Sequence, residues 1–183
     1  MNGGDLAHTD LAQTVRVIDD TRQIINALNL YALAIDSHRY ELFDQVFAPD
    51  VQADYTPPAG WTDREGIRRD MRIAHTPLDG CLHRITNHQV RVDGDRANSI
   101  CYVKVRLLKG DDFFEMGGFY DDDFARTAQG WLIKRRHYRG SWWKGNPRVL
   151  GGLESFVFDP TVQTLRHSAE ADEVSYLKAL AQT

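Results

Sequence analysis

The chain of 183 residues is long enough for one domain of ordinary size and too short for several. Hydrophobic residues make up 42% of it and charged residues 26%, which excludes a disordered or fibrous chain. A net charge of −4 leaves no basic excess to neutralise a phosphate backbone, so we expect no nucleic-acid partner. The N-terminus lacks an apolar signal core, and no apolar segment approaches about 20 residues. We therefore expect a cytoplasmic protein with no membrane contact.

The first third of the chain has helical periodicity. Residues 1–18 are polar and are expected to form an irregular N-terminal arm that can dock on a neighbouring subunit. Asp20 and Gln23 form a capping-box pattern, and apolar residues then recur at helical spacing. This pattern predicts a first helix that begins at Asp20 and ends near Asp36.

Shorter elements are expected after the first helix. An apolar stripe at 42–47 predicts a second short helix, which ends before Pro49 because the residue before a proline is pushed out of the helical region. Residues 51–55 alternate like a strand. The capping-box form of residues 62–65 then predicts the start of a third helix, which ends at 75–77.

The second half of the chain has the character of a β-meander. Runs rich in β-branched and aromatic residues predict four strands, at 83–92, 97–108, 113–125 and 131–138. Turn residues such as Asp93–Gly94 separate these runs. Helices followed by strands predict an α+β fold, in which N-terminal helices pack over a curved antiparallel sheet and enclose an apolar pocket.

This pattern divides the chain into three parts: an N-terminal arm at 1–18, a domain at 19–145 and a C-terminal extension at 146–183. The extension ends in an amphipathic stretch, so it could cover the pocket as a lid or contact a second subunit. Around Tyr102 and Phe119 the alternation of the sheet leaves apolar side chains to bury on its outer face. We therefore expect a homodimer or homotrimer.

Asp36 is the first candidate for chemistry. It stands at the end of an apolar helix, where the negative pole of the helix dipole disfavours a carboxylate by roughly 0.3–1 kcal/mol. A compensating partner should therefore lie close to it. Asp36 can equally cap the next helix, and the two roles are compatible.

Two histidines lie near the start of the first long strand. His83 and His88 are five residues apart, so in a regular strand their side chains point to opposite faces and do not share a metal ion. No spacing of Cys and His fits zinc, so we expect neither a metal nor a cofactor. Each histidine alone is typical of a structural residue. Paired with Asp36, however, a histidine becomes a base for proton abstraction near neutral pH.

Two tyrosines could donate hydrogen bonds to a substrate oxygen. Tyr31 lies on the first helix and Tyr55 ends the first strand. An offset of five residues separates Tyr31 from Asp36 by about 140° on a helix, so the two can converge only across a pocket rim. Core packing is the alternative for Tyr31. The candidate substrate-binding residues of the pocket are Trp61, Phe119, Trp142, Trp143 and His88.

Other motifs are assigned no chemistry. The run 121–123 of three aspartates alternates faces and cannot bind one cation, so we interpret it as solvated charge or as charge that protects a sheet edge. The basic run 134–137, with Arg139, could meet an anionic tail of a substrate, but we interpret it as a solvated face. Cys81 and Cys101 are expected to be buried small hydrophobes. No GxSxG and no phosphate-binding glycine loop is present in the sequence.

Several stretches between residues 20 and 139 together resemble the SnoaL-like family of the nuclear transport factor two-like superfamily, in its scytalone dehydratase-like branch. These stretches are 30–37, 46–51, 83–88, 92–97 and 130–134. The resemblance implies that the domain at 19–145 is a cone-shaped curved antiparallel sheet closed by helices around an apolar cavity.

The resemblance also implies roles for particular residues. Dehydratases of this kind pair an aspartate at the end of the first helix with a histidine that opens a central strand, and these positions correspond to Asp36 and His83 here. Tyr55 matches a tyrosine that polarises the carbonyl. A second pocket histidine of that branch falls near Leu107 or Leu108, and a pocket asparagine falls near Tyr120, so we do not expect scytalone itself as the substrate.

We therefore hypothesise a cofactor-independent lyase or isomerase that acts on a small apolar carbonyl compound or polycyclic compound. His83 would be the general base, oriented by Asp36, with Tyr31 and Tyr55 as donors. One alternative is a non-catalytic ligand-binding or structural subunit, because the superfamily includes both kinds of protein. Another is a polyketide cyclase or epoxide hydrolase, for which Asp54 and Glu115 are the available companions of Asp36.

Overall fold

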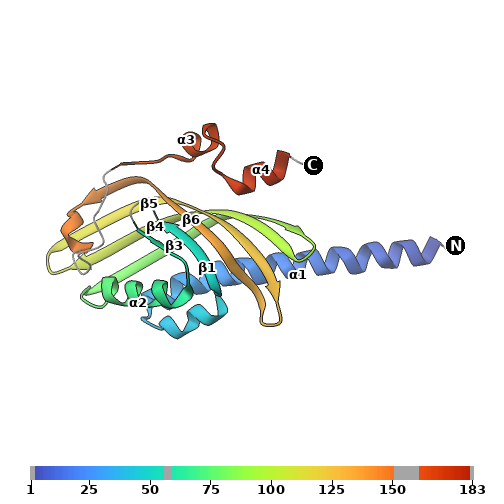
Figure 1. Cartoon of the computed structure of the whole chain (residues 1–183), viewed down its shortest axis with the longest axis horizontal. Helices are drawn as coiled ribbons and strands as arrows, with labels where there is room; N and C mark the ends of the chain where they lie inside the picture. The colour runs from blue at the N-terminus through green and yellow to red at the C-terminus, as the bar shows by residue number, and fades with distance from the viewer. Residues whose placement is uncertain (1–2, 56–58, 151–160, 182–183) are drawn as a thin grey trace.

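The computed structural model describes residues 3–55, 59–150 and 161–181, and in Figure 1 a six-stranded curved sheet separates two groups of helices. The elements in chain order are α1 (Gly3–Asp36), the 3₁₀ helix η1 (Tyr40–Gln45), β1 (Phe47–Tyr55), β2 (Ala59–Trp61), α2 (Arg64–His75), β3 (Gly80–Asp93), β4 (Arg96–Lys109), β5 (Asp112–Thr127), β6 (Gly130–Gly145), the 3₁₀ helix η2 (Pro147–Leu150), α3 (Leu165–Glu170) and α4 (Ser175–Ala181). The predicted α+β class is confirmed.

The sheet has the strand order β2-β1-β6-β5-β4-β3. Consecutive strands from β3 to β6 pair antiparallel, as the meander predicts, but β1 pairs parallel to β6. The sheet is therefore mixed rather than purely antiparallel, because the chain crosses from β2 through α2 to the far edge before the meander begins. This crossover places α1 and α2 on one face of the sheet, and Figure 1 shows α3 and α4 on the other.

Helix α1 is longer than the sequence predicted. The expected irregular arm at 1–18 is instead helical from Gly3 onward and continuous with the first helix. Its N-terminal half extends beyond the sheet in Figure 1, with Leu11 and Ile18 exposed at 59% and 63%. No proline interrupts this segment, so the turns that pack on the sheet can propagate the helix outward.

Asp20 does not cap the helix, as its capping-box pattern suggested, but lies inside it. Its carboxylate accepts two hydrogen bonds of 2.7 Å from the Arg126 guanidinium and one of 2.9 Å from Nε1 of Trp131. Asp20 is buried, and from Ile24 onward the residues of the inner face of α1 are buried too. Asp20 therefore marks the point where α1 reaches the sheet.

Helix α2 begins one residue later than its sequence pattern suggested. Asp63, rather than Thr62, is the N-cap: its side chain accepts a hydrogen bond of 2.8 Å from the backbone N–H of Gly66. The apolar face of α2 then packs Ile67 and Met71 into the core. This orientation brings His75, in the last turn, to the inner side of the sheet.

The aspartate run and the basic run are not solvated, because they lie on adjacent strands and face one another. The register pairs Asp122 with Arg136 and Asp123 with Arg135. Arg136 is fully buried on the inner face and donates two hydrogen bonds of 2.8 Å to Asp122. Arg135, on the outer face, binds Asp121 and Asp123.

The C-terminal helices cover part of the outer face of the sheet. Asp121 accepts the backbone N–H groups of Ser175 and Tyr176 at 2.9 and 3.0 Å and so fixes the start of α4. Val174 and Tyr176 then pack with Phe119 in a small apolar cluster. Within the described residues, no helix is both long and apolar enough to cross a membrane.

Candidate active site

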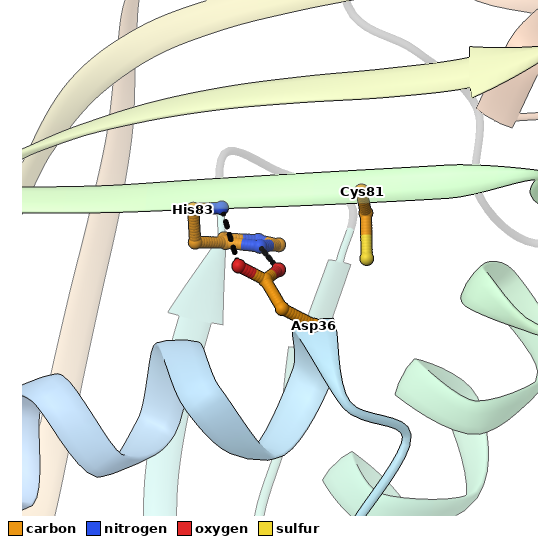
Figure 2. Close-up of side chains that lie close together, drawn as sticks. All are labelled: Asp36, Cys81 and His83. Atoms are coloured by element: carbon orange, nitrogen blue, oxygen red, sulfur yellow. Dashed lines mark hydrogen bonds and ion pairs between the residues drawn. The ribbon is translucent and has the colours of Figure 1, made fainter.

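Asp36 and His83 lie in direct contact, although 47 residues separate them in the chain. The Nδ1 atom of His83 lies 2.7 Å from Oδ1 of Asp36, and the backbone N–H of His83 donates to Oδ2 at 2.8 Å. Figure 2 shows the carboxylate at the end of α1 reaching the imidazole, which hangs from β3. The partner expected for a carboxylate at this helix end is therefore present, and the carboxylate does not cap η1, where no side-chain cap is found.

This contact determines which atoms of Asp36 and His83 carry protons. A carboxylate can only accept, so Nδ1 of His83 carries a proton and, in the neutral ring, Nε2 keeps a free lone pair. Burial raises the pKa of Asp36, but the hydrogen bonds from His83 outweigh it and hold this pKa below its ordinary value. The carboxylate is therefore ionised and orients an imidazole whose other nitrogen is available as a base.

An apolar cavity of about 90 Å³ lies on the inner side of the sheet beside this pair. Its wall includes His83, Tyr31 and Tyr55, together with residues of α2, β4, β5 and β6. Thr161 and Val162 also contribute to the wall, so the C-terminal extension lines the cavity of its own chain. The cavity therefore presents the His83 imidazole among largely apolar side chains, an arrangement common in small-molecule sites.

Tyr31 and Tyr55 converge in this cavity. The hydroxyl of Tyr55 donates to that of Tyr31 at 3.0 Å, so Tyr31 keeps its own proton to donate. The rings of Tyr31 and His83 meet edge to face with centroids 6.4 Å apart, so Tyr31 and Asp36 both lie close to the His83 ring. Burial raises the pKa of both tyrosines above the ordinary value. Both hydroxyls are therefore protonated donors at neutral pH.

A buried cation lies behind the tyrosines. The Arg136 guanidinium is 4.5 Å from the ring centre of Tyr31 and 4.1 Å from that of Tyr120. Burial lowers the pKa of Arg136, but the Asp122 carboxylate outweighs this effect and raises it well above the ordinary value. The rings that line the cavity therefore lie over a guanidinium that is always charged and is paired with the Asp122 carboxylate behind it.

His75 is a cavity residue that the sequence analysis did not select. It ends α2, is only 7% exposed, and its ring centre lies 5.8 Å from that of His83. Its Nδ1 atom lies 2.8 Å from the carbonyl oxygen of Met71, one turn earlier. Its helical spacing from Met71, at i and i+4 on the buried face, is the sequence signal that would have indicated it.

Asp36, Cys81 and His83 form a cluster whose ligand atoms lie within 4.8 Å of one another, and it is the single group in the described residues with the composition for a metal site. Figure 2 shows Cys81 and His83 on the same side of β3. Burial, together with Asp36, raises the pKa of the Cys81 thiol to about 12, which opposes the thiolate that a metal requires. A metal would also compete with the 2.7 Å hydrogen bond between Asp36 and His83. The arrangement therefore favours proton transfer over metal binding.

Two of the expected pocket residues lie outside the cavity. Trp61 packs against Tyr55 and lines a separate shallow groove beside α2. Phe119 points to the outer face, where α4 covers it. The bulge in this part of the hairpin adds Ser141 to β6, so β5 alternates regularly and Phe119 faces away from its neighbour Tyr120, which lines the cavity.

His88 also lies outside the cavity. Its spacing from His83 predicted that the two side chains point to opposite faces of the sheet, but both lie on the inner face. A bulge around Asn87, whose φ is +56°, adds one residue to β3. His88 therefore shares the inner face with His83, two residues before Val90, which packs on the core. Its Nε2 atom is buried with no hydrogen-bond partner among the described residues, and burial lowers the pKa of the ring.

Trp142 and Trp143 are among the residues at the cavity, and both are about 40% exposed. The indole of Trp142 passes directly over Gly117, where an added Cβ would lie 2.3 Å from its nitrogen. Gly117 pairs with Lys104, whose Nζ lies 5.5 Å from the Trp142 ring, so glycine at 117 makes room for the indole on the outer face of the sheet. Contact of either tryptophan with a substrate stays a prediction.

Comparison with solved structures defines the class of the fold. Kfla4162 from Kribbella flavida superposes with a TM-score of 0.69 at 24% identity, over 74% of this chain and 99% of that one. A protein from Novosphingobium aromaticivorans, provisionally described as a scytalone dehydratase, gives 0.68 at 22% identity, over 73% and 91%. At these identities the likeness shows the fold alone. It is the nuclear transport factor 2-like fold, with helices packed on a curved, unclosed sheet.

The chain belongs to the SnoaL-like domain family, whose model matches residues 16–137. An uncharacterized protein of Mycobacterium tuberculosis, Rv2910c, is 37% identical over 128 residues, which are 67% of this chain and 86% of the relative. The resemblance inferred from the sequence is therefore confirmed.

Proposed function

We propose that this protein is a cofactor-independent lyase or isomerase, in which His83 abstracts a proton next to a carbonyl group of a small, largely apolar substrate. The observation that carries the proposal is the 2.7 Å contact between His83 and Asp36 at the wall of an apolar cavity. Structural neighbours described as a scytalone dehydratase and as the hexachlorocyclohexane dehydrochlorinase LinA support a reaction of the elimination class. A cytoplasmic location remains a prediction.

The proposed reaction begins with His83. Its Nε2 lone pair takes a proton from the carbon beside the carbonyl, and the electron pair of that C–H bond moves onto the carbonyl oxygen. Asp36 stabilises the resulting imidazolium, and the Tyr31 hydroxyl donates to the enolate oxygen. The imidazolium then returns its proton to another carbon in an isomerisation, or to the departing hydroxyl in an elimination.

The probe for this step is cyclohex-3-enone, whose conversion to cyclohex-2-enone requires removal of one proton and its return to another carbon. We expect the wild-type protein to accelerate this conversion, as followed by ultraviolet absorbance. His83→Ala and Asp36→Asn should each lower the rate by at least about 10²-fold, the usual contribution of a positioned base. Wild-type protein that does not exceed the buffer rate would contradict the proposal.

A structural role for Asp36 must be separated from a catalytic one, because its carboxylate also accepts the backbone N–H of His83. Melting temperatures of both variants are therefore measured with the rates. His38→Asn is the matched control, since His38 is exposed and its φ of +56° is tolerated by asparagine. Variants at 36 and 83 that keep wild-type rates would favour the non-catalytic alternative.

A further inference from the structure

The state of His75 is determined by its place at the end of α2. A backbone carbonyl can only accept, so the 2.8 Å contact with Met71 requires a proton on Nδ1 of His75. Burial, followed by the nearby His83, lowers the pKa of His75 to about 4. His75 is therefore neutral at physiological pH, and its Nε2 atom carries a lone pair.

The lone pair on Nε2 of His75 accepts no hydrogen bond from the described part of the chain. His75 lines the cavity, and no described group donates a hydrogen bond to Nε2. The ring centre of His83 lies 5.8 Å away, and its Nε2 also carries a lone pair. The hydroxyls of Tyr31 and Tyr55 in the same wall are bonded to one another rather than to His75, so Nε2 of His75 is left for a donor that a ligand brings.

His75 also remains an acceptor when His83 is protonated. The Asp36 carboxylate hydrogen-bonds Nδ1 of His83 and so favours positive charge on that ring, whereas Nδ1 of His75 contacts a neutral carbonyl oxygen. The proposed base is therefore His83 and not His75. His75 cannot act as the acid for a leaving group, because a ring with a pKa of about 4 holds no proton to give at neutral pH.

We propose that Nε2 of His75 is a substrate-binding acceptor that selects ligands with a hydroxyl or N–H group. This inference rests on the proposed function, because it places the donor group beside the carbon that His83 deprotonates. The hydroxyl bound by His75 is one that the reaction retains, since an acceptor at a departing hydroxyl would oppose its protonation. The substrate class is thus a small carbonyl compound with a second, non-leaving donor group.

Phenol and toluene are suitable probes, because they have nearly the same shape and only phenol has a donor. Their binding to the full chain, labelled with ¹⁵N at histidine, is followed by long-range ¹H–¹⁵N spectra. We expect phenol to move the Nε2 resonance of His75 upfield and to bind at least tenfold more tightly than toluene. Toluene should leave that resonance in place.

His75→Asn is the informative variant, because the asparagine amide can keep the hydrogen bond to Met71 while the Nε2 atom is lost. We expect it to reduce the affinity for phenol to that for toluene, and to leave the affinity for toluene within twofold of wild type. His83→Ala should keep the preference for phenol. Circular dichroism confirms that both variants are folded.

Three results would overturn the inference: equal affinities of phenol and toluene for the wild type, a phenol preference that survives in His75→Asn, or a preference lost in His83→Ala alone. The assay measures no turnover. Its failure is therefore distinct from failure of the proposed reaction, which is judged by the isomerisation rate.

Discussion

Burial of His75 links the stability of the fold to pH. Its pKa falls from 6.5 to about 4 in the folded protein, so below pH 6.5 the unfolded chain binds a proton that the folded chain does not. The contribution of His75 is therefore constant above pH 6.5. As the pH drops from 6.5 to 4, this residue lowers the free energy of unfolding by up to about 3 kcal/mol.

We expect His75→Asn to flatten this dependence. Urea unfolding at pH 7, 5.5 and 4.5 should show wild-type stability falling more steeply than that of the variant. The lowered pKa values of His88 and His137 act in the same direction and are common to both proteins, so the comparison isolates position 75. If the free energy of unfolding changes equally with pH in wild type and variant, the buried His75 ring is not the cause of the pH dependence.

Individual residues also show how much of the candidate site could be predicted from the sequence. Asp36 was selected because a carboxylate at a helix C-terminus requires a partner, and the resemblance to scytalone dehydratase-like proteins indicated His83 as that partner. His75 was not selected: its spacing from Met71 indicates the buried face of α2, but whether that face reaches the cavity depends on how the helix docks. His88 was placed on the wrong face, since a bulge of one residue reverses the alternation that its prediction assumed.

At the scale of elements, the β5–β6 hairpin carries a buried charge pair. Asp122 and Arg136 are both fully buried, and the guanidinium binds the carboxylate through two parallel hydrogen bonds. Removing one partner leaves an uncompensated charge inside the core, which costs about 3–5 kcal/mol in comparable pairs. The pair therefore constrains the register of the hairpin more than it adds stability.

The prediction at this scale is a strong coupling between the two positions. Asp122→Leu and Arg136→Met should each lower the free energy of unfolding by about 3–5 kcal/mol, and the double variant should lose far less than their sum. Chemical denaturation of the four proteins measures this double-mutant cycle. Additive losses would mean that the two charges do not depend on one another.

The β5–β6 hairpin also explains why the aspartate run 121–123 and the basic run 134–137 are not solvated as predicted. The turn at 128–129 pairs Thr127 with Gly130, and extending that register would place Asp122 opposite Arg135. A bulge between Asp123 and Phe124 moves the register by one and brings Arg136 to the inner face instead. Complementary charge runs on consecutive strands were visible in the sequence, but the bulge that pairs them was not.

At the scale of the whole molecule, the outer face of the sheet is divided in two. The C-terminal helices cover the part around Phe119 and Ile100, so this apolar surface is buried by the chain itself. The part around Leu82 of β3 and Tyr102 of β4 is not covered within the described residues, and these two side chains are 47% and 46% exposed. The predicted homodimer or homotrimer would then bury the second part rather than the whole face.

We expect Tyr102→Glu to lower the molar mass of the protein in solution, measured by light scattering during size exclusion. A charge at the centre of a buried apolar contact is costly unless it is paired, so the assembly should dissociate toward the monomer. Leu33→Glu is the matched control, because Leu33 is an exposed apolar residue of α1, on a different element. A mass that falls only in the Leu33 variant would move the interface to α1, and a wild-type monomer would contradict the predicted assembly.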